Sequence, residues 1–459
     1  MKIFNTETKT LQTLTPNIPG KLQVFVCGPT VYDYSHVGHA KTYTQFDFIV
    51  KFLKRYYDVS FLMNITDVDD KIIARAKEQS SDPFAISRLY EDKFFEDMEW
   101  LNNEKPTIVA RAHDYIPQII SQVERLASIG AAYRLKDGWY FDLSKRNRET
   151  SSLTNRILTG DDNRSRLEKK NKRNDGDFVL WKFSKPGDPS WESKVLGNGR
   201  PGWHIEDTAI TEHFFGQNYD IHGGATDLIF PHHEAEMIQM ETLSNVKLAN
   251  YWIHTGLLEV DGRKMGKSLN NFITIRELKR NHSPLTLRLF FLSRHYRSTI
   301  EMNDDLLAES LGNRERVETL YRKTSKEHPD TPVQLEIIQK IKSDVYSALQ
   351  EDFNTPEAFA TFYTFVRDTN KGTSFGLETR KFLNEINSLF EVFDFSTPII
   401  SADTEEIENL ISQREEYRKT KKWAESDKIR NLLVSQFNVV VEDTPDAVSY
   451  THLTLPTKA

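Results

Sequence analysis

The first apolar run of the chain is short and leads into a long stretch with helical spacing. Residues 22–26 include β-branched and aromatic residues, and Gly28 and Pro29 end the apolar run. This pattern predicts a buried strand. Apolar residues then recur at helical spacing over 36–57, and a second strand pattern covers 59–65. A strand, a helix and a strand in this order predict a βαβ unit of a parallel sheet, with ligands at the carboxyl ends of the strands.

The middle of the chain mixes helical and strand patterns. Residues 83–130 are helical in period, 138–142 is the clearest of several short strands, and the charged, turn-rich segment 167–177 predicts a loop. Residues 199–206 predict a loop that runs into a helix, and 219–230 predict a glycine-interrupted strand and turn. The last two segments return the chain to the sheet, so we interpret residues from about 115 to 200 as an insertion.

Beyond residue 311 the pattern changes to long charged helices. Helical segments at 314–326 and 333–349, a turn at 354–356 and more helix to about 393 predict a helical bundle. A linker-like segment at 398–403 precedes a helix pair at 405–434. We therefore predict an α/β protein with a Rossmann-like parallel-sheet domain over 1–255, a connecting region over 256–312, a bundle over 313–398 and a small helical region over 399–446. Residues 447–459 fit no expected pattern; they are either a divergent tail or a sequence artefact and are left out of the predicted fold.

Composition narrows the class of protein. A chain of 459 residues is long enough for two or more domains, and it has neither a secretory leader pattern nor an apolar run that could span a bilayer, so no contact with a membrane is expected. The single cysteine, Cys27, excludes an internal disulfide and fits a reducing compartment, which favours the cytoplasm. The net charge of -7 does not decide whether a nucleic acid binds, because an acidic chain can still carry a basic face.

Two histidines mark the start of the first long helix. His36 and His39 lie three residues apart on one helical face, where the free N–H groups and the helix dipole favour phosphate, and Gly38 lets a ligand approach the backbone. Imidazoles at this position can donate to phosphoryl oxygens as charge develops. The alternative is structural: His36 caps the helix and His39 packs against its neighbours.

A second basic motif, KMGKS, lies far downstream. Its lysines, Lys264 and Lys267, follow a turn and flank a glycine, so the loop could bring positive charge onto a pyrophosphate leaving group. Taken alone, such a segment is more often an exposed turn.

A metal site is indicated by a third pattern. His232 and Glu236 are four residues apart at a predicted helix start after Pro231, so their side chains share one face and could bind one ion. The alternative is a helix-start histidine with a glutamate favoured by the helix dipole. With Cys27, the set offers a thiolate, an imidazole and a carboxylate, which are ligand types that zinc accepts.

Together, these motifs resemble the cysteinyl-tRNA synthetase family of class I aminoacyl-tRNA synthetases. HVGHA and KMGKS resemble the two signatures of the class. The family resemblance rests on CGPTVYDYSHVGHA, NITDVDDKIIARA, GDFVLWK, RPGWHIE, DIHGGATDLIFPHHEAE, KMGKSLNNF, LSRHYRS and EDFNTPEA, which occur in the family's order from about Phe4 to about Asp446. The resemblance implies a ligase that activates L-cysteine with ATP to cysteinyl-adenylate and transfers cysteine to the 3′ end of tRNA(Cys). Mg²⁺ is implied with ATP, and the protein is expected to be a monomer.

The resemblance also assigns expected roles to residues. His36, His39, Lys264 and Lys267 would hold the triphosphate beside Gly38. His222, Gly223 and Gly224, followed by Asp227, look like the adenosine-binding strand and turn, in which glycines permit close approach and a carboxylate accepts from ribose hydroxyls. Thr66 and Trp203 match residues around the amino-acid pocket, and the alternative for Trp203 is a core aromatic.

The zinc site departs from the family pattern at one position. The resemblance implies zinc ligands at Cys27, His232, Glu236 and a second cysteine after GWHIE, where this chain has Asp207. Aspartate can bind zinc, so a site with Asp207 stays plausible, with a weaker hold on the metal. Alternatively, Asp207 is a helix-start carboxylate and the metal is lost. We expect zinc to be retained, because the other three ligand types are present, and to bind the substrate's thiolate in preference to the hydroxyl of serine.

The helix pair at 405–434 matches the family's anticodon-binding end. Arg418, Lys421 and Lys422 beside Trp423 combine positive charge with an aromatic ring, which suits phosphate contact and base stacking. The alternative is a solvated helix face with Trp423 in the core. Two other functions stay open: a related class I ligase that joins cysteine to a small-molecule amine, and a non-catalytic paralogue that binds tRNA. The bundle and the anticodon-like end argue against the first, and intact HVGH and both lysines argue against the second.

Overall fold

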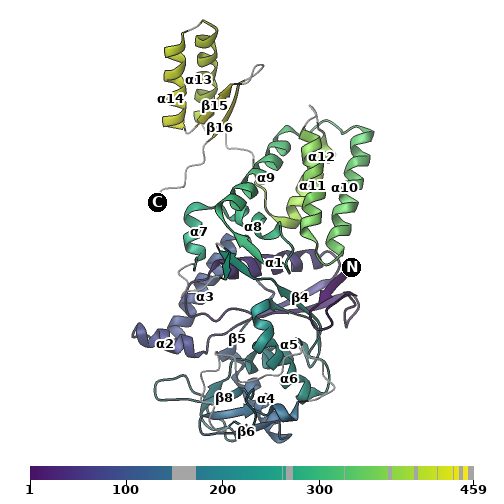
Figure 1. The fold of residues 1–459 in the computed structure, drawn as a ribbon, viewed down its shortest axis with the longest axis vertical. Coiled ribbons are helices and arrows are strands. Elements are labelled where there is room, and N and C mark those ends of the chain that lie inside the picture. The colour runs from purple at the N-terminus through teal and green to yellow at the C-terminus, as the bar shows by residue number, and fades with distance from the viewer. Residues whose placement is uncertain are drawn as a thin grey trace. The chain divides into compact units, whose positions relative to one another are not determined.

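The protein is described from a computed structural model (Figure 1). The structure describes the chain except for residues 147–152, 154–171, 261, 265–271, 325, 371–374, 397–401, 421, 438, 444–447 and 453–459. The chain divides into two compact units, Met1–Phe393 and Asp394–Ala459.

A five-stranded parallel sheet forms the centre of the first unit. Its order is β11-β10-β3-β4-β5, and the strands are β3 (Lys21–Val26), β4 (Asp58–Ile65), β5 (Ile108–Arg111), β10 (Tyr219–Ala225) and β11 (Ala249–Thr255). The predicted βαβ unit is confirmed, because β3, α1 (Val37–Leu53) and β4 follow one another and the two strands pair in parallel. The strand order reverses between β3 and β10, and ligands of such sheets bind at the carboxyl ends beside that reversal.

Helix α1 is covered on both faces, although its sequence predicts one apolar stripe. Nearly every residue from Val37 to Leu53 is buried, because α8 (Pro284–Leu292) and α12 (Leu377–Phe390) also pack against it. The buried Asp47 carboxylate pairs with Arg288 and lies 3.1 Å from the ammonium of Lys51. Helical spacing predicts that the polar residues of α1 face solvent. Asp47 and Lys51 are instead buried and form internal ion pairs.

The prediction of continuous helical structure over 83–130 is wrong. Helix α3 (Pro83–Trp100) ends before Asn102, which has a positive φ of 58°, and β5 then pairs with β4. The β-branched residues Ile108 and Val109 thus complete a sheet edge, and this tertiary pairing overrides the local helical period. Helix α4 (Ile116–Ser128) follows as a separate element.

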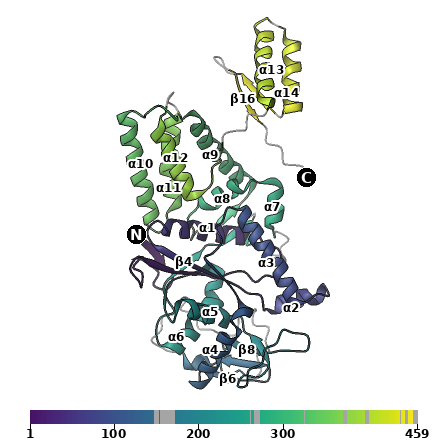
Figure 2. The ribbon, with the colours of Figure 1, turned by 180° about the vertical axis from the view of Figure 1, so that it is seen from behind.

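The predicted insertion is confirmed as a small antiparallel sheet. Its order is β6-β7-β8-β9, with strands β6 (Ala132–Arg134), β7 (Gly138–Phe141), β8 (Val179–Phe183) and β9 (Gly199–Pro201). Phe141 and Trp181 of this sheet share a core with α4 and α5 (Ile205–Phe215). Figures 1 and 2 show this sheet and the helical bundle on opposite sides of the parallel sheet.

The bundle is built from the predicted long helices. It contains α9 (Asp304–Lys323), α10 (Pro332–Gln350), α11 (Thr355–Asn370) and α12. The remaining α-helices and strands described in the first unit are β1 (Lys2–Asn5), β2 (Thr10–Thr13), α2 (Asp70–Glu78), α6 (Glu234–Ser244), β12 (Leu258–Val260), β13 (Arg263–Lys264), α7 (Ile275–Asn281) and β14 (Ile300–Met302). Among the described residues, no helix has the length and apolar character needed to cross a membrane.

The second unit contains the predicted helix pair, α13 (Ala402–Lys419) and α14 (Trp423–Phe437). Ile407, Ile411, Ile429 and Leu433 form its core. No structure is predicted from the sequence for residues 447–459. In the structure, Val448–His452 form the strand β16, which pairs with β15 (Val439–Asp443). The alternating pattern of Val448 and Tyr450 suits such an edge strand.

Candidate active site and metal centre

The chemistry-bearing residues gather at the carboxyl ends of β3, β10 and β4. Cys27 directly follows β3, and Thr66 directly follows β4. His232 and Glu236 come from the turn after β10 and from the first turn of α6. Asp207 lies in the first turn of α5, which the insertion returns to the same edge. The fold thus brings together side chains that are separated by more than 200 positions in the sequence.

Four predicted metal ligands face one another in a buried cluster. The Cys27 sulfur lies 3.3 Å from Asp207 Oδ2 and 3.4 Å from His232 Nε2. His232 Nε2 lies 3.1 Å from Asp207 Oδ2 and 2.9 Å from Glu236 Oε1. A tetrahedral zinc ion with bonds of about 2.0–2.3 Å separates its ligand atoms by roughly 3.3–3.6 Å. The observed spacing is close to that value, so the residues present fit a zinc ion.

The electrostatics of the cluster also suit a cation. Burial and the Asp207 carboxylate raise the pKa of the Cys27 thiol well above its ordinary value, and burial raises the pKa of Glu236 to about 7. Burial opposes the protonation of His232, but Glu236 and Cys27 reverse this effect and raise its pKa. Three acidic groups around one imidazole are costly to ionise in a dry site, and a divalent cation would offset that cost.

Two aromatic rings hold His232 in place. Its Nδ1 lies 2.7 Å from Nδ1 of His204, and the Trp203 ring stacks on the imidazole with centroids 4.5 Å apart. Burial lowers the pKa of His204, so its ring is neutral and its Nδ1 can accept a hydrogen bond from the N–H at His232 Nδ1. The arrangement leaves His232 Nε2 directed at the cluster, as in the outer contacts of metal-binding histidines. Trp203 is only half-buried, so part of this residue is accessible to solvent.

The structure adds two residues that the sequence analysis does not single out. Asn64 of β4 donates to Asp207 Oδ1 at 2.6 Å, and the Thr66 hydroxyl donates to the buried carboxylate of Glu206. Burial and Asp207 raise the pKa of Glu206 well above its ordinary value. Both residues belong to motifs that carry the family resemblance, since Asn64 begins NITDVDDKIIARA and Glu206 ends RPGWHIE.

The predicted adenosine strand is more enclosed than its glycines suggest. His222 is fully buried, with Nδ1 2.7 Å from the Tyr219 hydroxyl and Nε2 3.5 Å from Glu236 Oε2. A Cβ on Gly223 would lie 2.6 Å from the Phe46 ring, and one on Gly224 would lie 2.7 Å from the His233 ring. These glycines are required by internal packing. Asp227 is exposed just beyond the strand.

The two histidines of HVGH form a capping box at the start of α1. His36 Nδ1 accepts from the Gly38 N–H at 3.1 Å, and His39 Nδ1 accepts from the His36 N–H at 3.4 Å. The rings stack with centroids 3.8 Å apart. Because both Nδ1 atoms accept, the proton of each neutral ring lies on Nε2. Burial lowers the pKa of His39, and the nearby His36 ring lowers it further. The lowered pKa favours the neutral form of His39, which donates through Nε2.

Residues that follow the lysine motif in the chain lie beside this box. Thr274 pairs with His36 as an isolated bridge, and the Phe272 ring lies 5.2 Å from the His36 ring. At the upstream end, Lys264 is the last residue of β13. Lys267 lies outside the described residues.

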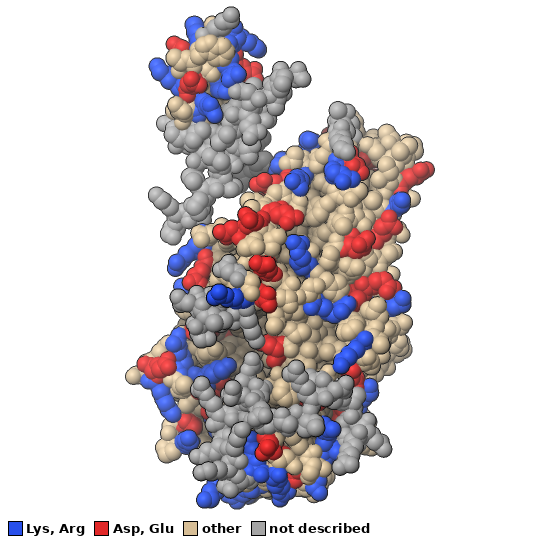
Figure 3. Space-filling model, viewed as in Figure 1, with Lys and Arg blue, Asp and Glu red and all other residues tan. Residues whose placement is uncertain are grey.

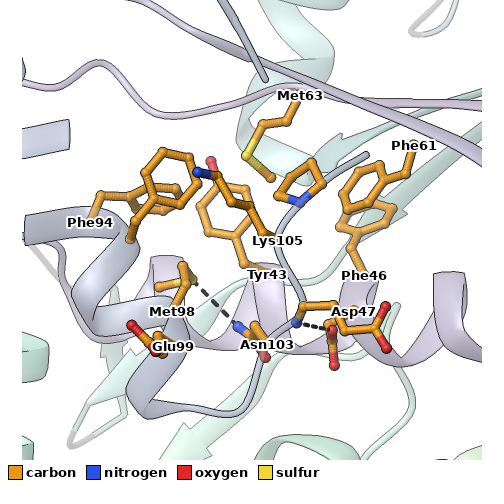
Figure 4. Close-up of a pocket in the computed structure, with 13 residues that line it drawn as sticks. Tyr43, Phe46, Asp47, Phe61, Met63, Phe94, Met98, Glu99, Asn103 and Lys105 are labelled. Atoms are coloured by element: carbon orange, nitrogen blue, oxygen red, sulfur yellow. Dashed lines mark hydrogen bonds between the residues drawn. The ribbon is translucent and has the colours of Figure 1, made fainter. Parts of the chain in front are cut away.

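A cavity of about 380 Å³ lies behind the site, between α1, α3 and β4 (Figure 4). Aromatic rings, including Tyr43, Phe46 and Phe94, and the Met98 side chain face it. The Tyr43 hydroxyl donates to the Cys27 carbonyl at 3.2 Å, so the cavity wall supports the end of β3. No residue in the cavity lining is among the predicted site residues.

The second unit carries an exposed aromatic ring with basic neighbours. Trp423 is 56% exposed, which excludes a core position, and the Arg418 guanidinium lies 5.8 Å from its ring centroid. Lys422 is exposed beside it, and Lys421 lies outside the described residues. Figure 3 shows several Lys and Arg side chains on the surface of this unit.

Comparison with known proteins covers nearly the whole chain. The family model "tRNA synthetases class I (C) catalytic domain" matches residues 13–312, and the DALR domain model matches residues 344–395. A cysteine–tRNA ligase of Thermoplasma volcanium is 40% identical over 453 residues, which cover 97% of this chain and 98% of that protein. A cysteine–tRNA ligase of Lactococcus lactis is 37% identical over 456 residues, covering 98% and 99%.

Solved structures with lower identity share the fold. A methionyl-tRNA synthetase of Mycobacterium tuberculosis in complex with methionyl-adenylate has a TM-score of 0.58 at 15% identity and covers 81% of this chain and 89% of its own. A leucyl-tRNA synthetase of Agrobacterium radiobacter in a ternary complex has a TM-score of 0.56 at 11% identity, with coverage of 82% and 83%. The predicted α/β fold with its insertion and helical C-terminal region is therefore confirmed.

Proposed function

Given that the chain belongs to the cysteinyl-tRNA synthetase family of class I aminoacyl-tRNA synthetases, we propose how its own residues carry out the ligation of cysteine to tRNA. The carboxylate of L-cysteine attacks the α-phosphorus of ATP, pyrophosphate leaves, and a 3′-terminal hydroxyl of tRNA(Cys) then takes the cysteinyl group from AMP. The observation that carries the proposal is the convergence, at the carboxyl ends of the strands, of the HVGH capping box and of Cys27, Asp207, His232 and Glu236, which are linked by contacts of 2.9–3.4 Å.

The capping box serves the triphosphate. Each Nδ1 atom accepts from a backbone N–H, and we expect the Nε2–H groups of His36 and His39 to donate to phosphoryl oxygens when ATP is bound; the backbone at Gly38 offers the positive end of α1. Lys264 and Lys267 would bring two charges to the pyrophosphate, and Phe272, which follows them in the chain, lies beside His36. Mg²⁺ would accompany ATP, and Asp227 would accept from the ribose hydroxyls at the exposed end of the turn.

The buried cluster serves the amino acid. Cys27, Asp207, His232 and Glu236 would hold one zinc ion, and zinc when bound supplies a Lewis acid that takes a thiolate in preference to a serine hydroxyl. Trp203 closes one side of the pocket by stacking on His232, and Thr66 fixes the buried Glu206 beside it. The protein orients cysteine and ATP toward each other, and no side chain acts as a covalent nucleophile.

Two assays test this function together. Purified protein should catalyse cysteine-dependent exchange of pyrophosphate into ATP and should charge tRNA(Cys) with cysteine. Exchange without charging would favour a ligase for a small-molecule amine, and absence of both would favour a paralogue that only binds tRNA. We place the reaction in the cytoplasm and expect a monomer, which light scattering of the pure protein would check.

Replacing Asp207 by cysteine should strengthen the metal site. A second thiolate is a softer ligand than a carboxylate, so we expect Asp207→Cys to bind zinc about tenfold more tightly. Chelator competition with both proteins measures the difference, and the wild type should still carry one zinc per chain. A wild type that carries no zinc yet selects cysteine strongly over serine would contradict the proposed pocket.

The exposed tryptophan of the second unit should contribute to tRNA binding only. Stacking on a base is worth ~1–3 kcal/mol, so Trp423→Ala should raise the KM for tRNA at least about fivefold. Exchange of pyrophosphate, which needs no tRNA, should not change. Leu89, an exposed apolar residue of the first unit, offers a matched control, and Leu89→Ala should leave both values unchanged. An equal KM for wild type and Trp423→Ala would place base recognition elsewhere.

A further inference from the structure

The amide of Asn64 is fully buried and bridges two of the elements that carry the proposed metal ligands. Its Oδ1 accepts from the backbone N–H of Gly28 at 2.7 Å, and its Nδ2 donates to Asp207 Oδ1 at 2.6 Å. Because a backbone N–H can only donate, the first contact fixes which end of the amide faces Gly28. The NH₂ end must therefore face Asp207.

The hydrogen bond from Asn64 gives the two Asp207 oxygens different partners. Oδ1 is taken by Asn64, while Oδ2 faces the Cys27 sulfur at 3.3 Å and His232 Nε2 at 3.1 Å. A carboxylate that is free to rotate can offer both oxygens to one ion, whereas a thiolate offers a single atom. An anchored carboxylate thus imitates the single donor atom of a cysteine.

We infer that Asn64 is the positioning residue that makes Asp207 a one-oxygen ligand and so keeps the metal four-coordinate. The inference rests on the metal site proposed above. It assigns to Asn64 a function that depends on aspartate at position 207: with cysteine there, no second oxygen has to be restrained. Outer contacts of this kind typically change metal affinity by ~10–100-fold.

The test uses Co²⁺ as the probe and four full-length proteins: wild type, Asn64→Ala, Asp207→Cys and the double variant. Four-coordinate Co²⁺ absorbs visible light more strongly than five-coordinate Co²⁺, so the spectrum reports whether one or two carboxylate oxygens bind. In the wild-type background, Asn64→Ala should weaken Co²⁺ binding by ~10–100-fold and reduce the visible absorption. In the Asp207→Cys background, the same change should leave the spectrum unaltered and affinity within about threefold.

The comparison separates positioning from folding. Loss of the Gly28 contact affects all Asn64→Ala proteins equally, so any destabilisation that it causes should be the same in both backgrounds. Asn64→Asp keeps an acceptor for Gly28 and removes the donor to Asp207, so it should impair Co²⁺ binding even if Asn64→Ala folds poorly. Equal loss of affinity in both backgrounds, or an unchanged wild-type spectrum in both Asn64 variants, would overturn the inference. Failure of the wild type to bind Co²⁺ would instead overturn the proposed metal site.

Discussion

Replacing Cys27 by serine is expected to abolish cysteine-dependent pyrophosphate exchange, with a fall in kcat/KM for cysteine of at least ~100-fold. Cys27 is the only cysteine in the chain, and its sulfur lies within 3.4 Å of both Asp207 and His232. A serine hydroxyl is a poor and largely protonated ligand, so the variant should also lose its zinc. Replacing a residue that only contacts a metal ligand can lower metal affinity or activity by up to ~100-fold. Replacing a direct ligand should lower them at least as much.

A double variant controls for the number of thiolates in the site. Cys27→Ser with Asp207→Cys contains one thiolate, like the wild type, but presents it from α5 and not from the end of β3. We expect this protein to regain part of the zinc and little of the exchange activity, because the position of the sulfur relative to HVGH has changed. Activity close to the wild type in either Cys27→Ser protein would show that the thiolate at position 27 is not needed.

Sequence patterns predict the sheet and the ligand set because both depend on local signals. The apolar runs that became β3 and β4, and the helical period of α1, are visible without any long-range information. His232 and Glu236 share a helical face at a fixed spacing, so their proximity also follows from the sequence. Cys27 joins them in the sequence analysis through its ligand chemistry, and only the family resemblance points to Asp207, which lies on a different element.

Long-range packing accounts for what the sequence did not predict. The strand β5 has only four residues and lies within a helical period, so its pairing with β4 decides its conformation. In the sequence, Asn64 has the pattern of any polar residue near a strand end. Only the folded structure shows that Asp207 lies beside it. The sequence predicts that Gly223 and Gly224 permit a ligand to approach, and the fold adds a second reason for glycine there, because the rings of Phe46 and His233 occupy the space of a side chain.

Replacing His36 by asparagine is expected to separate the two roles of the HVGH motif. His36 caps α1 by accepting from the Gly38 N–H, and asparagine is among the most favourable capping residues. We therefore expect the free energy of unfolding to stay within about 0.5 kcal/mol of the wild type. The shorter side chain cannot bring an N–H to the position of His36 Nε2, so kcat for pyrophosphate exchange should fall about 100-fold, as for loss of one charge-stabilising donor.

His36→Ala provides the matched comparison, because it removes the cap and the imidazole together. It should lose the same activity as His36→Asn and, in addition, about 1 kcal/mol of stability in urea unfolding. Equal activity losses with unequal stabilities would mean that the imidazole acts on the phosphates and not through the helix. If His36→Asn kept wild-type exchange while His36→Ala lost it, the cap would be the whole function of His36, and the structural interpretation of HVGH would hold for this residue.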